Sequence, residues 1–135
     1  MFVNQLAIET GMAFAIVADP EWRVISDAID GMDGVEHTMV SLGNGGTHSM
    51  TIGGGPALCV VHATADGKTF YTLVDPSQSG SHVDLVLCQQ PAQYPSEWTV
   101  PKEVALKAAE FFAETGELVP DVNWQQNDTQ ETADE

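Results

Sequence analysis

The segment from Pro101 to Gly116 constrains the fold most, because its residues have the spacing of a helix with one broad apolar side. Proline suits the first turn of a helix, where its missing N–H is not needed, and glycine suits the left-handed residue just past a helix end. The proline at the start and the glycine at the end therefore predict a helix over residues 101–115. The side opposite its charged residues carries Val104, Ala105, Ala108, Ala109, Phe111 and Phe112. An apolar side of this width is typical of a helix that lies on a sheet.

Apolar residues alternate with a period of two in the middle of the chain, where turn residues separate short runs. Strands are predicted over 35–42, 47–52, 57–64, 69–74 and 83–88. No helix of crossover length fits between neighbouring runs, so these strands should pair antiparallel. Together with a predicted helix over 20–30, they indicate an α+β fold. We expect a mostly antiparallel sheet of about five or six strands, packed against an N-terminal helix and a C-terminal helix.

The secondary structure of two further stretches is less clearly indicated by the sequence. Residues 13–18 could form a strand that leads to the first helix, with Asp19 as its cap and Pro20 in its first turn. The segment from Asp75 to Trp98 is rich in serine, proline and glycine, and apart from the strand at 83–88 it is predicted to be loop.

The length of 135 residues suits one domain. We expect a single domain over residues 1–125 and a disordered acidic tail over 126–135, because the tail has four acids and no base. The amino terminus has no basic region of the kind that opens a signal peptide, and no apolar run approaches the length of a membrane span. A bacterial cytoplasmic location is therefore expected, with Cys59 and Cys88 reduced inside strands.

The charge of the chain limits its partners. Twenty acids against four bases give a formal charge of −16 and a pI near 4.1. Such a chain repels phosphate backbones, whose binding depends on Lys and Arg, so direct nucleic-acid binding is excluded. The charge indicates a basic macromolecular partner. A role in solubility, or in a salt-rich cytoplasm, accounts for the acidity equally well.

No set of residues has the spacing of a catalytic or metal site. The four histidines are scattered, and the chain has no Cys-x-x-Cys motif. They are His37, His48, His62 and His82. Cys59 and His62 are three apart on a strand and should point to opposite faces. A cluster of carboxylates misses the calcium-loop pattern and is better explained as a solvated helix end. It comprises Asp27, Asp30, Asp33 and Glu36. No catalytic residue, metal or cofactor is therefore predicted.

The segment 98–124 carries a family resemblance. A helix ends in an aromatic pair, and Thr-Gly, a proline, a valine and a tryptophan follow it. This pattern resembles the carboxy-terminal signature of the first numbered immunity-protein family of bacterial polymorphic toxin systems. The signature residues, to which we assign a structural role, are Phe112, Thr115, Gly116, Pro120 and Trp124. The family is associated chiefly with nucleic-acid deaminase toxins. The resemblance implies a non-enzymatic inhibitor that covers the basic active-site groove of a cognate toxin, such as a DNA or RNA cytidine deaminase.

The candidate toxin-binding residues combine acids with aromatic side chains, since interfaces favour aromatic anchors within a polar rim. They are Asp75, Asp84, Tyr94, Glu97 and Trp98. Alternatively, Trp98 packs under the helix start and the acids are merely solvated. Two other functions remain open from the sequence: a small-ligand-binding protein or enzyme with His62, Tyr71 or Asp75 in a pocket on the sheet, and an acidic adaptor module.

Overall fold

The computed structural model describes residues 2–9, 13–35, 37–78, 80–87 and 90–126. A large sheet is built from β1 (Gln5–Glu9), β2 (Phe14–Ala18), β3 (Met39–Gly43), β4 (Ser49–Gly54), β5 (Leu58–Thr64), β6 (Phe70–Val74), β9 (Val100–Pro101) and β10 (Asn123–Gln126). A separate hairpin consists of β7 (His82–Leu87) and β8 (Gln90–Pro95). The helices are α1 (Trp22–Asp30) and α2 (Lys102–Thr115), with short 3-10 turns η1 (Pro76–Gln78) and η2 (Ser96–Trp98).

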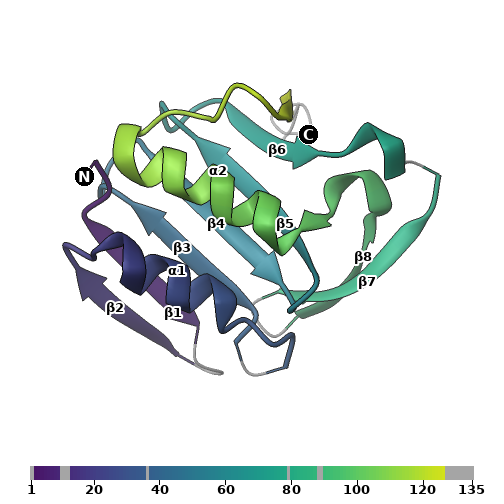
Figure 1. Cartoon of the computed structure of the whole chain (residues 1–135), viewed down its shortest axis with the longest axis horizontal. Helices are drawn as coiled ribbons and strands as arrows, with labels where there is room; N and C mark the ends of the chain where they lie inside the picture. The colour runs from purple at the N-terminus through teal and green to yellow at the C-terminus, as the bar shows by residue number, and fades with distance from the viewer. Residues whose placement is uncertain (1, 10–12, 36, 79, 88–89, 127–135) are drawn as a thin grey trace.

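The strands of the large sheet lie in the order β10-β6-β5-β4-β3-β1-β2, and β9 pairs with β5 beside this path. Every pairing is antiparallel. Both helices lie on one face of this sheet (Figure 1). The predicted α+β class with a mostly antiparallel sheet is therefore confirmed, and among the described residues this sheet has eight strands where about five or six were expected. The strand that the sequence allowed over 13–18 is present as β2, and the strands that it did not predict are β1, β8, β9 and β10.

The core lies between the two helices and the sheet. Met50, Ile52 and Val61 alternate along β4 and β5 and point toward the helices, where all three are buried. Alanines at 105, 108 and 109 bring α2 close to the sheet. Phe112 is 0% exposed and lies in the core between α2 and the sheet. Phe111, expected on the same apolar side, is only half-buried. The sequence therefore predicted the core side of α2 correctly except at its rim.

The helix α2 begins one residue later than predicted. Pro101 pairs with Leu58 in β9 and is the residue before the helix, because its extended backbone (φ −60°, ψ 153°) belongs to the strand. The predicted end is confirmed. Gly116 has a φ of 78°, and its N–H donates to the Phe112 carbonyl at 2.8 Å. A side chain at Gly116 would also meet the Phe2 ring, since an added Cβ would lie 2.7 Å from it.

The start of α1 differs from the prediction for a physical reason. Asp19 has a φ of 50°, and its N–H donates to the Asn4 carbonyl at 2.8 Å, so this residue ends the β2 region instead of capping the helix. The residue before the first helical turn is Glu21, without a side-chain cap, and α1 starts at Trp22. Pro20 therefore precedes the helix and does not lie in its first turn.

The chain after α2 returns to the sheet. Trp124 lies in β10 opposite Leu73, and its indole N–H donates to the Val119 carbonyl at 2.9 Å. Gln126, which the sequence assigns to the tail, pairs with Tyr71. The rest of the predicted tail, residues 127–135, lies outside the described residues. Among the described helices, none combines the length and the apolar character needed to cross a membrane.

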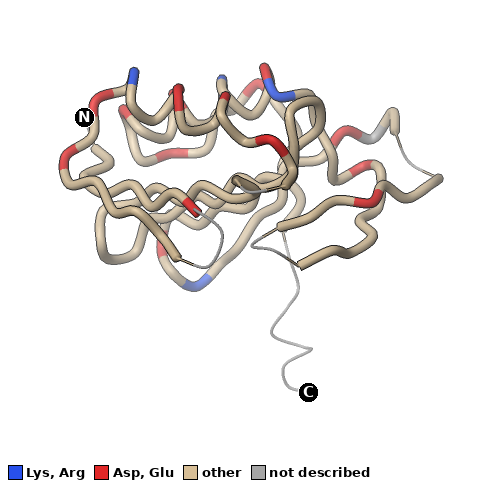
Figure 2. The backbone as a smooth tube through the Cα atoms, turned by 90° about the horizontal axis from the view of Figure 1, so that it is seen from below, with Lys and Arg blue, Asp and Glu red and all other residues tan. Residues whose placement is uncertain are grey.

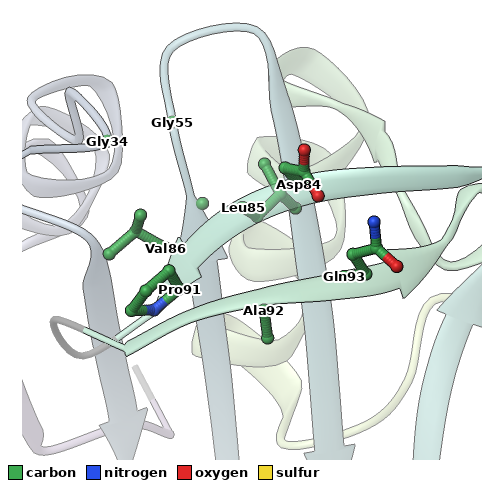
Figure 3. A pocket seen from close by; sticks show the side chains of 9 residues that line it. Gly34, Gly55, Asp84, Leu85, Val86, Pro91, Ala92 and Gln93 are labelled. Carbon is green, nitrogen blue, oxygen red and sulfur yellow. The ribbon is translucent and has the colours of Figure 1, made fainter.

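The hairpin β7–β8 corrects the prediction of loop after residue 88. It crosses the face of the large sheet that carries no helix, which we call the open face (Figures 2 and 3). Leu87 packs against Gly53 of β4, where an added Cβ would lie 2.4 Å from the Leu87 Cγ. Glycine at 53 therefore allows the hairpin to approach the sheet closely. Cys88 lies outside the described residues.

Candidate functional site

A polar row crosses the open face of the sheet. The register places Ser41 beside Thr51, Thr51 beside His62 and His62 beside Thr72. The His62 Nδ1 lies 2.9 Å from the Thr72 hydroxyl oxygen, and the Trp98 ring packs edge-on at a centroid distance of 6.2 Å. Trp98 thus packs against His62 on the open face of the sheet, and it is half-buried.

His62 should make stability depend on pH. Burial lowers the pKa of His62 below its usual 6.5, so the unfolded chain takes up a proton before the folded chain does as the pH falls. The stabilisation is complete above pH 6.5 and is lost below it, by at most about 1.4 kcal/mol per pH unit. We expect His62→Gln to flatten the fall in unfolding free energy between pH 7 and 5, measured by urea denaturation. Parallel pH profiles for both proteins would contradict this assignment.

The residues of the alternative pocket do not come together. Tyr71 lies opposite Ala63 and therefore on the helix-bearing face, whereas His62 lies on the open face. Asp75 accepts hydrogen bonds from the Ser77 N–H at 3.1 Å and the Ser77 hydroxyl at 2.6 Å, and thereby holds the turn η1. The three residues thus form no common site for an enzyme or a small-ligand-binding protein.

The structure also gives no support for a metal site, a cysteine nucleophile or a functional carboxylate cluster in the part of the chain that it describes. Among the described residues, no three His, Cys, Asp or Glu lie close enough to hold a metal ion. Burial raises the pKa of the Cys59 thiol to about 11, so it is not a nucleophile at neutral pH. Within the carboxylate cluster, Asp33 accepts hydrogen bonds from the Val35 and His37 N–H groups and shapes a loop. Glu36 of the same cluster lies outside the described residues.

The five candidate toxin-binding residues fall into two groups. Asp75, Glu97 and Trp98 meet where the two 3-10 turns touch, because the Asp75 N–H donates to the Glu97 carbonyl at 2.6 Å. Asp84 and Tyr94 lie on the hairpin, opposite Gln93 and Val83 respectively, so they point to opposite faces of it. We call the hairpin together with η1 and η2, residues 75–98, the hairpin side.

The hairpin side carries acids without compensating bases. The chain has no Lys or Arg between Lys68 and Lys102, and that interval includes three acids. Of the four bases, Arg23 lies in α1, Lys102 and Lys107 lie in α2, and Lys68 lies in the turn between β5 and β6, so most of the blue segments in Figure 2 follow the helix layer. Two of these are engaged there: Lys107 contacts Asp121 at 2.5 Å, and the Lys102 ammonium donates to two backbone carbonyls at 3.2 Å. The field around the hairpin side is therefore negative.

A pocket of about 540 Å³ opens between the hairpin and the turn that joins β4 to β5 (Figure 3). We call it the hairpin pocket. Its lining includes Gly34, Gly54 and Gly55 on one wall and Asp84, Val86 and Gln93 on the other. The sequence identified Asp84 as a candidate, but it did not associate this residue with the glycines. The glycines are distant in sequence, so no local pattern could have shown the pocket.

The sequence also missed an exposed apolar strip on the edge strand β2. Phe14 and Ile16 are 44% and 58% exposed, and the register places both on the open face. Exposed apolar side chains on an edge strand are typical of interaction surfaces. Their spacing of two was readable from the sequence, but the edge position of the strand was not.

Residues 14–126 match the sequence profile of a family described as Immunity protein Imm1. Proteins of this class protect a cell by binding a toxin partner. The match spans most of the chain and includes the predicted signature segment, so the chain belongs to the Imm1 immunity-protein family. No curated protein matches this chain closely enough to serve as a relative.

Proposed function

We propose that this immunity protein binds a toxin domain of the nucleic-acid deaminase type in the bacterial cytoplasm and inhibits it by covering its basic active-site groove. The observation that carries the proposal is the uncompensated acidity of the hairpin side, whose three acids are Asp75, Asp84 and Glu97. The overall charge of −16 acts in the same direction. The protein itself performs no catalysis in this account.

The inhibition follows from electrostatic competition. A toxin that modifies nucleic acid needs a basic groove for the phosphate backbone. An acidic protein is attracted to the same groove over long range, and this attraction speeds association. Asp84 lies on the exposed hairpin, and Glu97 lies beside the half-buried Trp98. The half-buried Trp98 then supplies aromatic area beside Glu97, since aromatic side chains are enriched in interfaces, whereas Tyr94 points to the hairpin face opposite Asp84.

The test is a titration of toxin activity. The purified cognate toxin domain is given a single-stranded oligonucleotide, and conversion of cytosine to uracil is measured as the immunity protein is added. We expect loss of activity at one equivalent, and we expect an unrelated protein of similar pI to have no effect. Full activity at a large excess of the folded immunity protein would reject the proposal. Inhibition of a toxin with another nucleic-acid activity would correct only its chemical class.

A further inference from the structure

We propose that the hairpin pocket receives an arginine or lysine side chain of the toxin, with Asp84 as its counter-ion. This inference rests on the proposed function and goes beyond it, because it names one anchoring site and the chemistry of its occupant. The pocket combines what a long basic side chain needs, namely an apolar channel for the stem and an acceptor for the charged head.

The hairpin wall of the pocket supplies both the apolar channel and the acceptor. Asp84 lies directly opposite Gln93, and the next pair on the same hairpin face is Val86 with Pro91. Figure 3 shows Asp84 and Gln93 at one end of the pocket and Val86 and Pro91 at the other. A basic side chain can therefore lay its stem along the apolar pair. Its head then reaches a carboxylate and an amide oxygen, which are both hydrogen-bond acceptors.

The opposite wall is backbone without side chains. Gly34 and Gly54 have positive φ angles of 78° and 127°, which other residues rarely adopt. A Cβ at Gly54 would also lie 2.6 Å from the Leu58 carbonyl oxygen, so a larger residue cannot be placed there without moving the backbone. The fold thus keeps this wall open. The volume of about 540 Å³ accommodates a long side chain together with part of the loop that carries it.

The charge of the pocket selects a basic occupant from the toxin. Among the described residues, the Asp84 carboxylate has no hydrogen bond or ion pair, and no Lys or Arg lines the pocket. An anionic group would be repelled by Asp84 and by the net charge of −16. A second copy of this chain carries that same charge, which opposes self-association at this site. A basic toxin surface has the complementary charge.

The test compares two isosteric neutralisations in complexes with a catalytically inactive toxin domain. Asp84→Asn should raise the dissociation rate and weaken the affinity by about 30-fold, because it leaves a covered cationic head without its counter-ion. Glu110→Gln is the matched control, since it makes the same charge change at an exposed position of α2, away from the hairpin side. Its affinity should change less than about threefold. Asp84 is exposed in the free protein, so unfolding midpoints should be equal for all three proteins.

A double-mutant cycle then identifies the occupant. Asp84→Asn is combined with each Arg→Gln or Lys→Gln variant of the toxin surface, and the dissociation constants are compared. We expect one toxin position at which the two changes are strongly non-additive. Equal affinities for the parent and Asp84→Asn, or additivity at every toxin position, would overturn the pocket inference while the parent still inhibits. A parent that neither binds nor inhibits the toxin would instead reject the proposed function.

Discussion

Replacing Phe112 with alanine should lower the free energy of unfolding by about 3 to 5 kcal/mol, the usual loss for a fully buried phenylalanine. The side chain is 0% exposed and lies in the core between α2 and the sheet. Its neighbours are held by the sheet and by α2, so the cavity left behind cannot collapse fully. Urea denaturation followed by circular dichroism measures the loss directly.

Phe111→Ala is the matched control on the same helix. The sequence indicated that both phenylalanines are buried, but Phe111 is half-buried and borders a surface hollow with Glu110 and Glu114. We therefore expect a smaller loss of about 1 to 2 kcal/mol, because much of the ring already contacts water. Equal losses for the two variants would show that α2 is rotated from the described position.

The double reversal Asp84→Lys with Glu97→Lys should slow association with the toxin by about tenfold or more at low salt. Both side chains lie on the hairpin side, where no base offsets them, so four units of charge change act on the approaching basic groove. The difference should shrink as salt rises, since exposed charges are screened over about 10 Å at 0.1 M. Stopped-flow association rates at several ionic strengths measure both effects. Asp75 is left unchanged because its carboxylate holds η1.

Glu110→Lys with Glu114→Lys provides the control for net charge. These residues lie in the last turns of α2 and are exposed, and lysines near a helix C-terminus are favourable. The variant has the same formal charge as the hairpin-side double reversal. If only net charge matters, the two variants should associate at equal rates. If the hairpin side meets the toxin, the association rate of the helix variant should remain much closer to that of the parent.

The sequence predicted those parts of the fold that depend on local patterns. The period of α2 and the left-handed residue at Gly116 are properties of one segment, and the structure confirms both. The same holds for β4, whose alternation predicted that Met50 and Ile52 share one face. These features follow from neighbours in the chain, so a single sequence contains enough information to predict them.

The missed elements depend on distant partners. Strand β8 contains Pro91 and Pro95, which disfavour strand structure except at edges, and it forms only because β7 pairs with it. Strand β10 is short and forms against β6, about fifty residues earlier in the chain. The hairpin pocket needs Gly34, Gly55 and Asp84 from three separate segments. No local pattern contains such a juxtaposition, although the acidity of residues 75–98 was visible from the sequence.

Amide hydrogen exchange on the complex shows whether the hairpin side meets the toxin. Exchange is compared for the free protein and for the one-to-one complex with the inactive toxin domain. We expect new protection in peptides from residues 75–98 and around Gly34 and Gly55, with α2 unchanged. Protection confined to residues 13–18, where Phe14 and Ile16 are exposed, or to the helix layer would contradict this expectation.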